Sequence, residues 1–194
     1  MKDFTRCALL VALLLLPSAL LANPITIDFD GLSDLDSVTN QFPGFTFFNA
    51  TVLSAGFSLN EFEFPPHSGS NLVFDDGGAL VISFLTPFDS FSGYFTYSQS
   101  LTLEAFDASN NLLGTVNSAF FSNLALSGDP GSSPNEFLSL SFAGISSVRI
   151  TGDPTGGSFV LDDLTATVPE PSSILLLLSG TAGLAAFRKK LKFV

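Results

Sequence analysis

Several residue types that define common protein classes are scarce in this chain of 194 residues. It contains one Cys, one His and no Trp, which excludes disulfide frameworks, Cys-rich zinc sites, haem-attachment motifs and His-based metalloprotease motifs. Basic residues are also few, with 7 Lys and Arg against 18 Asp and Glu. A protein that binds nucleic acid needs basic patches to contact phosphates, so that class is excluded as well.

The first 22 residues have the three-part pattern of a secretory signal peptide. Lys2 and Arg6 precede an uncharged apolar run, 8–16, and small residues follow up to Ala22. The run is too short to span a bilayer. It also lacks the polar positions at helical spacing that a buried core helix would have. We therefore expect residues 1–22 to form a signal helix that is removed after Ala22 during export.

The C-terminal segment, 169–194, combines a tripeptide, an apolar run and a basic end: Pro169, Glu170 and Pro171, then 172–187, then 188–194 with Arg188, Lys189 and Lys190. As a helix, the apolar run reaches about 24 Å, short of a hydrocarbon core of ~30 Å. The basic side chains extend it by snorkelling and hold the C-terminus in the cytoplasm. We expect a transmembrane helix over 172–187, with residues 23–168 outside the membrane.

This order of tripeptide, apolar segment and basic cluster resembles the PEP-CTERM sorting signal of Gram-negative, exopolysaccharide-producing bacteria. The resemblance implies that exosortase, an integral-membrane cysteine transpeptidase, recognises Pro169, Glu170 and Pro171. It also implies that the basic residues fix the topology, and that the protein passes the inner membrane with a transient anchor before reaching the cell surface or the medium. The alternative is an ordinary C-terminal anchor in which the tripeptide occurs by chance.

The segment between these ends, 23–168, is strongly acidic. It contains one basic residue, Arg149, and 16 acids, a net charge of −15. Such a segment is repelled by anionic headgroups and other acidic surfaces, and divalent cations become plausible partners.

The same segment has the pattern of an all-β domain. Runs rich in β-branched and aromatic residues are separated by turn-forming clusters at the spacing of sandwiches and barrels. The expected strands are 25–30, 44–53, 71–75, 79–85, 91–97, 101–107, 111–118, 136–143, 147–152 and 158–167. No helical stretch could serve as a crossover, so the expected fold is an antiparallel β-sandwich. Asp107 to Asn111 supplies the residues of a hairpin turn.

A second resemblance concerns the fold of this segment. It is similar to exported PEP-CTERM proteins with a jelly-roll, galactose-binding-like domain, and the blocks that carry the similarity are 66–74, 80–84 with Pro87, 103–108, 113–114, 148–151 and 159–164. The blocks are mostly the pattern of core strands. The resemblance implies a fold and does not identify a sugar.

Four carboxylates suggest a structural calcium ion. The first and last strands of such sandwiches often lie side by side, which would bring Asp28 close to Asp162 and Asp163, with Asp30 nearby. The spacing around Asp28 is not that of an EF-hand, because Leu32 stands at position five and Thr39 at position twelve. The alternative is that these residues are solvated strand ends on an acidic surface.

The remaining candidate residues point away from catalysis. His67 is expected in a loop without a catalytic role, because Ser68 lacks the flanking glycines of a nucleophile elbow. No carboxylate pair is singled out by its spacing for glycoside hydrolysis. Tyr94 and Tyr97 are the only tyrosines and, three apart on one strand, should face opposite sides of the sheet. Asp75 and Asp76, followed by two glycines, are expected in a turn.

The sequence therefore predicts a non-enzymatic, exported cell-surface or matrix protein that associates with exopolysaccharide in a structural or adhesive role. Two alternatives stay open at this point. One is a calcium-dependent carbohydrate-binding module, and the other is an extracellular polysaccharide hydrolase with an unrecognised carboxylate pair.

Overall fold

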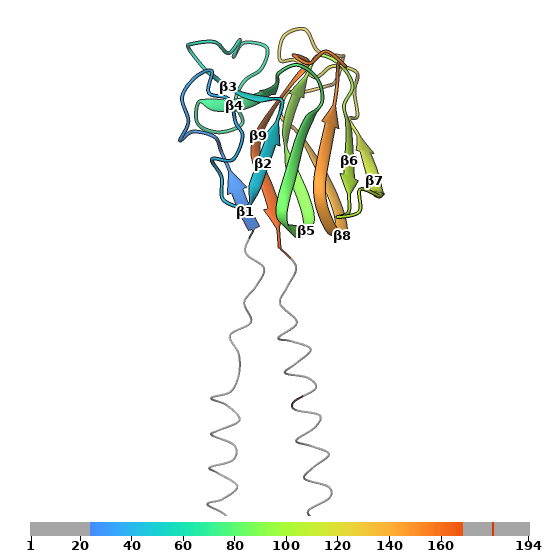
Figure 1. Cartoon of the computed structure of the whole chain (residues 1–194). Helices are drawn as coiled ribbons and strands as arrows, with labels where there is room; N and C mark the ends of the chain where they lie inside the picture. Colours follow the sequence, from blue (N-terminus) through green and yellow to red (C-terminus); the bar gives the residue numbers. More distant parts are fainter. Residues whose placement is uncertain (1–23, 169–179, 181–194) are drawn as a thin grey trace, which may run out of the picture. The chain divides into compact units, whose positions relative to one another are not determined.

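The computed structural model describes residues 24–168 and Gly180 (Figure 1). The expected signal helix, the Pro-Glu-Pro tripeptide and the basic end lie outside the described residues, as does the expected transmembrane segment apart from Gly180. Among the residues that are described, no helix has the length and apolar character needed to cross a membrane.

Residues 24–168 contain nine strands and no helix. The strands are β1 (Pro24–Ile27), β2 (Phe45–Phe48), β3 (Ala50–Ser54), β4 (Asn71–Asp75), β5 (Leu80–Tyr97), β6 (Thr102–Phe106), β7 (Leu112–Asn117), β8 (Glu136–Thr151) and β9 (Phe159–Thr167). Every pairing between them is antiparallel. The predicted all-β, antiparallel class is confirmed.

Two long strands turn one hydrogen-bonded sheet into two layers. The strand order is β3-β4-β9-β5-β8-β6-β7, with β1 beside β9 and β2 beside β5. β5 and β8 pair over nearly their whole length (Figure 1), but their register shifts between Ser83 and Ser90. Before the shift, β5 pairs with β2 and with the end of β8; after it, β5 pairs with β9 and with the start of β8. The strands thus pass from one layer of the sandwich to the other.

The core between the layers is rich in phenylalanine. Phe45 packs against Phe84 and Phe88 with ring centroids 5.5 Å apart in each case, and Phe29, which follows β1, contacts Phe47 of β2 at 6.1 Å. All five rings are at most 8% exposed. Burial of each such side chain stabilises the fold by ~1.5–3 kcal/mol, in a segment that contains no cysteine.

Apart from single residues at strand ends, the structure differs from the expected strands in four places. The strand expected over 25–30 ends at Ile27, and Phe29 beyond it has a φ of 60°. The single strand expected over 44–53 is divided at Asn49, whose φ of 57° breaks the ladder between β2 and β3. The two strands expected on either side of 86–90 are one bent strand, β5, and the two expected around 144–146 are one strand, β8. The predicted hairpin at Asp107 is confirmed, with Asn110 at a φ of 61° between β6 and β7.

A long loop covers part of the outer face of the second layer. Leu59 in this loop packs against Leu72 of β4 and Val160 of β9, all at most 5% exposed. The outward-facing residues in 90–92 of β5, 139–141 of β8 and 165–167 of β9 are partly or fully exposed.

Candidate functional site

The loop 65–70 is held on the sheet by two carboxylates, the buried Asp162 and the exposed Asp30. Asp162 is 1% exposed, and its Oδ2 accepts the backbone amides of His67 at 2.8 Å and Ser68 at 3.0 Å. At the other end of the loop, Asp30 Oδ1 accepts the amides of Ser70 and Asn71 at 2.9 and 3.0 Å. The loop is therefore fixed at both ends by hydrogen bonds to charged acceptors.

A glycine permits this close approach. Gly69 has a φ of 51°, and a Cβ at this position would lie 1.6 Å from Oδ2 of Asp30. Any other residue would push the loop away from the carboxylate.

A bulge in β9 directs two adjacent carboxylates toward the same loop. The register between β5 and β9 shifts after Ser92, and Asp163 has a φ of 46°, so Asp162 and Asp163 do not alternate between faces as strand neighbours normally do. Asp163 instead accepts a hydrogen bond from the Ser68 hydroxyl at 2.9 Å and lies 2.6 Å from Nδ1 of His67.

These contacts set the His67 ring into a row of three aromatic side chains. The imidazole stacks on Tyr94 with centroids 3.4 Å apart and planes at 10°. Tyr94 in turn contacts Phe137, its cross-strand neighbour on β8, at 5.3 Å. The Phe137 ring is 55% exposed. We call His67, Tyr94 and Phe137 the aromatic ledge.

Hydroxyl side chains continue this surface beyond the ledge. The ladder places Ser92 opposite Ser139 of β8 and opposite Thr165 of β9, and Ser90 opposite Ser141 and Thr167. All six are partly or fully exposed. The resulting hydroxyl face comprises Ser90, Ser92, Ser139, Ser141, Thr165 and Thr167.

Burial raises the pKa values of two aspartates, Asp162 and Asp75. The pKa of Asp162 is raised to about 6, first because burial penalises its charged form and also because Asp163 is negative; the donated amides oppose the shift. The pKa of Asp75 is raised by burial as well, again against amide hydrogen bonds. For both carboxylates, burial changes the pKa more than the opposing hydrogen bonds do.

The structure brings the predicted metal ligands to one end of the domain without forming a cluster. β1 and β9 lie side by side, as expected, with Ile27 opposite Leu164. Among the described residues, Asp28 accepts only the amide of Asp30, at 3.2 Å, whereas Asp162 and Asp163 hold the loop. Within residues 24–168, no group of three or more His, Cys, Asp or Glu side chains is placed to hold a metal ion. The calcium site stays a prediction.

His67 is in a loop, as predicted, and its neighbours do not form a Ser-His-Asp triad. Ser68 donates its hydroxyl to Asp163 rather than facing the imidazole as a nucleophile would. The prediction for the tyrosines is also confirmed. Tyr97 is fully buried on the core side and its hydroxyl bonds Glu136, whereas Tyr94 lies in the ledge on the outer side.

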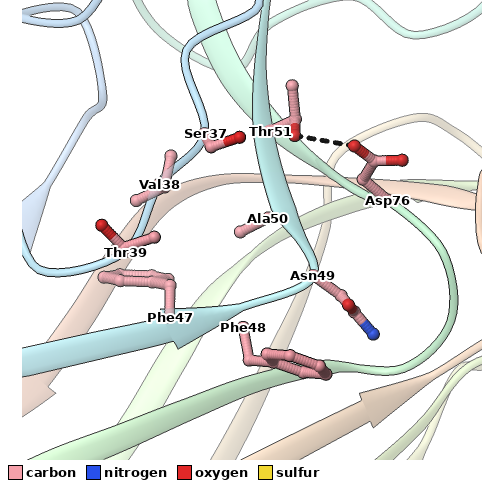
Figure 2. Close-up of a pocket in the computed structure, with 9 residues that line it drawn as sticks. All are labelled: Ser37, Val38, Thr39, Phe47, Phe48, Asn49, Ala50, Thr51 and Asp76. Carbon is pink, nitrogen blue, oxygen red and sulfur yellow. Dashed lines mark hydrogen bonds between the residues drawn. The ribbon is translucent and has the colours of Figure 1, made fainter.

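A separate pocket of about 220 Å³ lies where β2 leads into β3 (Figure 2). Phe48, 66% exposed, and Asp76 are among its lining residues. The Thr51 hydroxyl donates to Oδ2 of Asp76 at 2.9 Å, and Nδ2 of Asn49 donates to the carbonyl of Ala79 at 3.1 Å. One hydrogen bond therefore orients the side chain of Asp76, and another orients the side chain of Asn49. The turn expected at Asp75 and Asp76 exists only after Asp75, which ends β4 and is buried.

Comparison with protein families bears on the C-terminal segment. Residues 167–190 match the family described as PEP-CTERM protein-sorting motif. The chain carries this sorting motif. The match favours the sorting signal over an ordinary anchor with a chance tripeptide. The PEP-CTERM motif implies processing by exosortase, export, and membrane-anchored sorting in Gram-negative bacteria.

Solved structures with a similar arrangement of strands come from other bacteria. The K1 cleaved adhesin domain of Lys-gingipain from Porphyromonas gingivalis W83 is 9% identical, with a TM-score of 0.46, and the match covers 76% of this chain and 99% of that domain. A DUF4465 family protein from Bacteroides caccae is 11% identical, with a TM-score of 0.49 and coverages of 76% and 100%.

A CBM35 from Paenibacillus barcinonensis is 15% identical, with a TM-score of 0.39 and coverages of 76% and 99%. At these identities, none of the three structures assigns a ligand to this chain. Among curated proteins, no sequence matches it.

Proposed function

We propose that residues 24–168 form a non-enzymatic, carbohydrate-binding adhesive domain, which the PEP-CTERM motif delivers to the cell surface, where it associates with exopolysaccharide. The observation that carries this proposal is the aromatic ledge beside the hydroxyl face. Aromatic rings stack on the C–H faces of sugars, and neighbouring hydroxyls exchange hydrogen bonds with sugar hydroxyls.

The ledge is also rigid, which favours binding of an extended chain. His67 is held at its backbone by Asp162 and at its ring by Asp163, so the ring does not have to be ordered when a ligand binds. A platform that is ordered in advance loses less entropy on association. The ledge and the hydroxyl face extend over the neighbouring strands β9, β5 and β8, which offers an extended polymer several points of contact.

The test is the substitution Phe137→Ala in the full chain, with binding measured to purified exopolysaccharide of the producing bacterium. We expect binding to weaken about tenfold, because the most exposed ring of the ledge is lost and aromatic anchors dominate such contacts.

Phe121→Ala is the matched control, because Phe121 is similarly exposed at 61% but lies in the loop after β7. Equal binding by the wild type and the Phe137 variant would contradict the proposal, as would an equal loss in the control.

A further inference from the structure

The pocket between β2, β3 and the residues after β4 is not part of the ledge. It is lined by the exposed ring of Phe48, the hydroxyls of Ser37 and Thr39, and the side chains of Asn49 and Asp76 (Figure 2). Its volume of about 220 Å³ is below the ~300–1,000 Å³ typical of sites for drug-sized molecules. The space therefore suits one small ring rather than a stretch of polymer.

The one charged group of this pocket, the carboxylate of Asp76, is already oriented by a hydrogen bond. Thr51 holds Oδ2 of Asp76, which leaves Oδ1 without a hydrogen bond among the described residues. The backbone amide of Asp76 donates to the carbonyl of Asn49 at 3.1 Å, which holds the backbone at Asp76 next to the turn between β2 and β3. The free oxygen of Asp76 accepts a donor from a ligand, and a positively charged donor gains most from a carboxylate.

The charge of the whole domain also favours a positively charged ligand. Between residues 24 and 168 the only Lys or Arg is Arg149. Its guanidinium lies 3.8 Å from Glu104 and 5.1 Å from the centroid of Phe106. His67, the other basic side chain, faces Asp163. A uronic acid or a sulfated sugar would therefore meet no uncompensated cation here, and the field of 16 acids would repel it.

From these observations we propose that the pocket binds an amino-sugar unit of a polysaccharide, with the sugar ammonium on Asp76 and the sugar ring against Phe48. The proposal rests on the proposed carbohydrate-binding function and names the class of sugar. The ammonium donates to Oδ1 of Asp76, and the C–H face of the ring packs on the aromatic side chain. The ledge and the pocket are separate contacts, so the pocket selects the polymer to which the ledge adheres.

The experiment compares three hexasaccharides by calorimetry on the full chain in detergent: β-1,4-linked glucosamine, β-1,4-linked N-acetylglucosamine and galacturonate. We expect glucosamine to bind about tenfold more tightly than its acetylated form, because acetylation removes the charge-assisted hydrogen bond. Galacturonate should not bind. The preference for glucosamine should fall as sodium chloride is raised, since the pocket is open to solvent.

The deciding variant is Asp76→Asn, which keeps an acceptor for Thr51 and removes the charge. It should lower affinity for the glucosamine probe about tenfold and leave the acetylated probe unchanged. Asp89→Asn is the matched control, because it removes the same charge from β5 beyond its pairing with β2. Phe48→Ala should weaken both probes alike.

Equal affinity for the two glucosamine probes would overturn the amino-sugar proposal and leave the adhesive function intact. An equal loss in Asp76→Asn and Asp89→Asn would also overturn it, because the effect would then come from net charge rather than from the pocket. Failure of all probes, together with no binding to the native exopolysaccharide, would contradict the proposed function itself.

Discussion

Asp75–Asp76 and Asp162–Asp163 are two pairs of adjacent aspartates, and the first member of each pair holds two segments of the chain together. Asp75 is fully buried and accepts the amides of Ser158 and Phe159 at 2.9 and 3.0 Å, which ties the turn before β9 to the end of β4. Asp162 is 1% exposed and ties the loop 65–70 to β9 in the same way. In each pair the first carboxylate is a buried clamp.

The second members of the pairs differ, and so do their consequences. Asp76 is exposed and keeps one oxygen available beside a pocket. Asp163 has both oxygens engaged, by Ser68 and by the ring of His67. In both pairs the buried first aspartate accepts backbone amides, but only in the first pair does the second aspartate, Asp76, keep an oxygen that a ligand can reach.

The largest expected effect comes from removing the most buried clamp. Asp75→Ala should lower the free energy of unfolding by about 3 kcal/mol, because buried amides and the Ser158 hydroxyl lose their acceptor. Asp76→Ala, one residue away and exposed, should cost less than about 1 kcal/mol. Urea denaturation measures both, and losses of the same size would remove the distinction between clamp and neighbour.

A pH titration sharpens the comparison at the second pair. The pKa of Asp162 is about 6 in the folded protein against an ordinary value of 3.8, so the folded state binds the proton more tightly than the unfolded chain. The wild type should therefore lose stability, relative to Asp162→Asn, as pH rises from about 4 through about 6. Unfolding free energies of both proteins across this range are the measurement, and parallel curves would contradict the raised pKa.

The smallest expected effect is that of calcium. Asp30, Asp162 and Asp163 already accept hydrogen bonds from the loop, so an ion at this end should raise the melting temperature by a few degrees at most. Asp28→Asn should abolish the rise with little cost of its own, since Asp28 accepts a single amide. A melting temperature that ignores both a chelator and millimolar calcium would exclude the ion.

Much of the fold follows from local patterns in the sequence. The alternation of Leu138 and Leu140 with Ser139 and Ser141 predicts a strand with one buried and one exposed row, and the structure confirms it. β4 and the hairpin at Asp107 are also where the pattern places them. These features depend on neighbours a few residues away, which a sequence displays directly.

The features that escape prediction depend on residues far apart in the chain. His67 and Asp163 are 96 residues apart, and nothing local predicts that a bulge in β9 turns Asp163 toward His67. The bend that joins 79–85 and 91–97 into β5 is likewise set by its pairing with β8. One signal was available: Phe137 stands in the exposed row with Ser139, where a large apolar residue is not needed for the core.

The position of β9 determines how the domain responds to a pulling force on its C-terminal end. β9 is bonded to β5 on one side and to β4 and β1 on the other, and it leads within one residue to the sorting tripeptide. A pull exerted through residue 168 runs along the strand, so the rungs to β5 and β1 bear it simultaneously, in shear. The hydrogen bonds between the strands are therefore not broken one at a time. Force applied at residue 168 should therefore unfold the sandwich less easily than the same force applied across the strands.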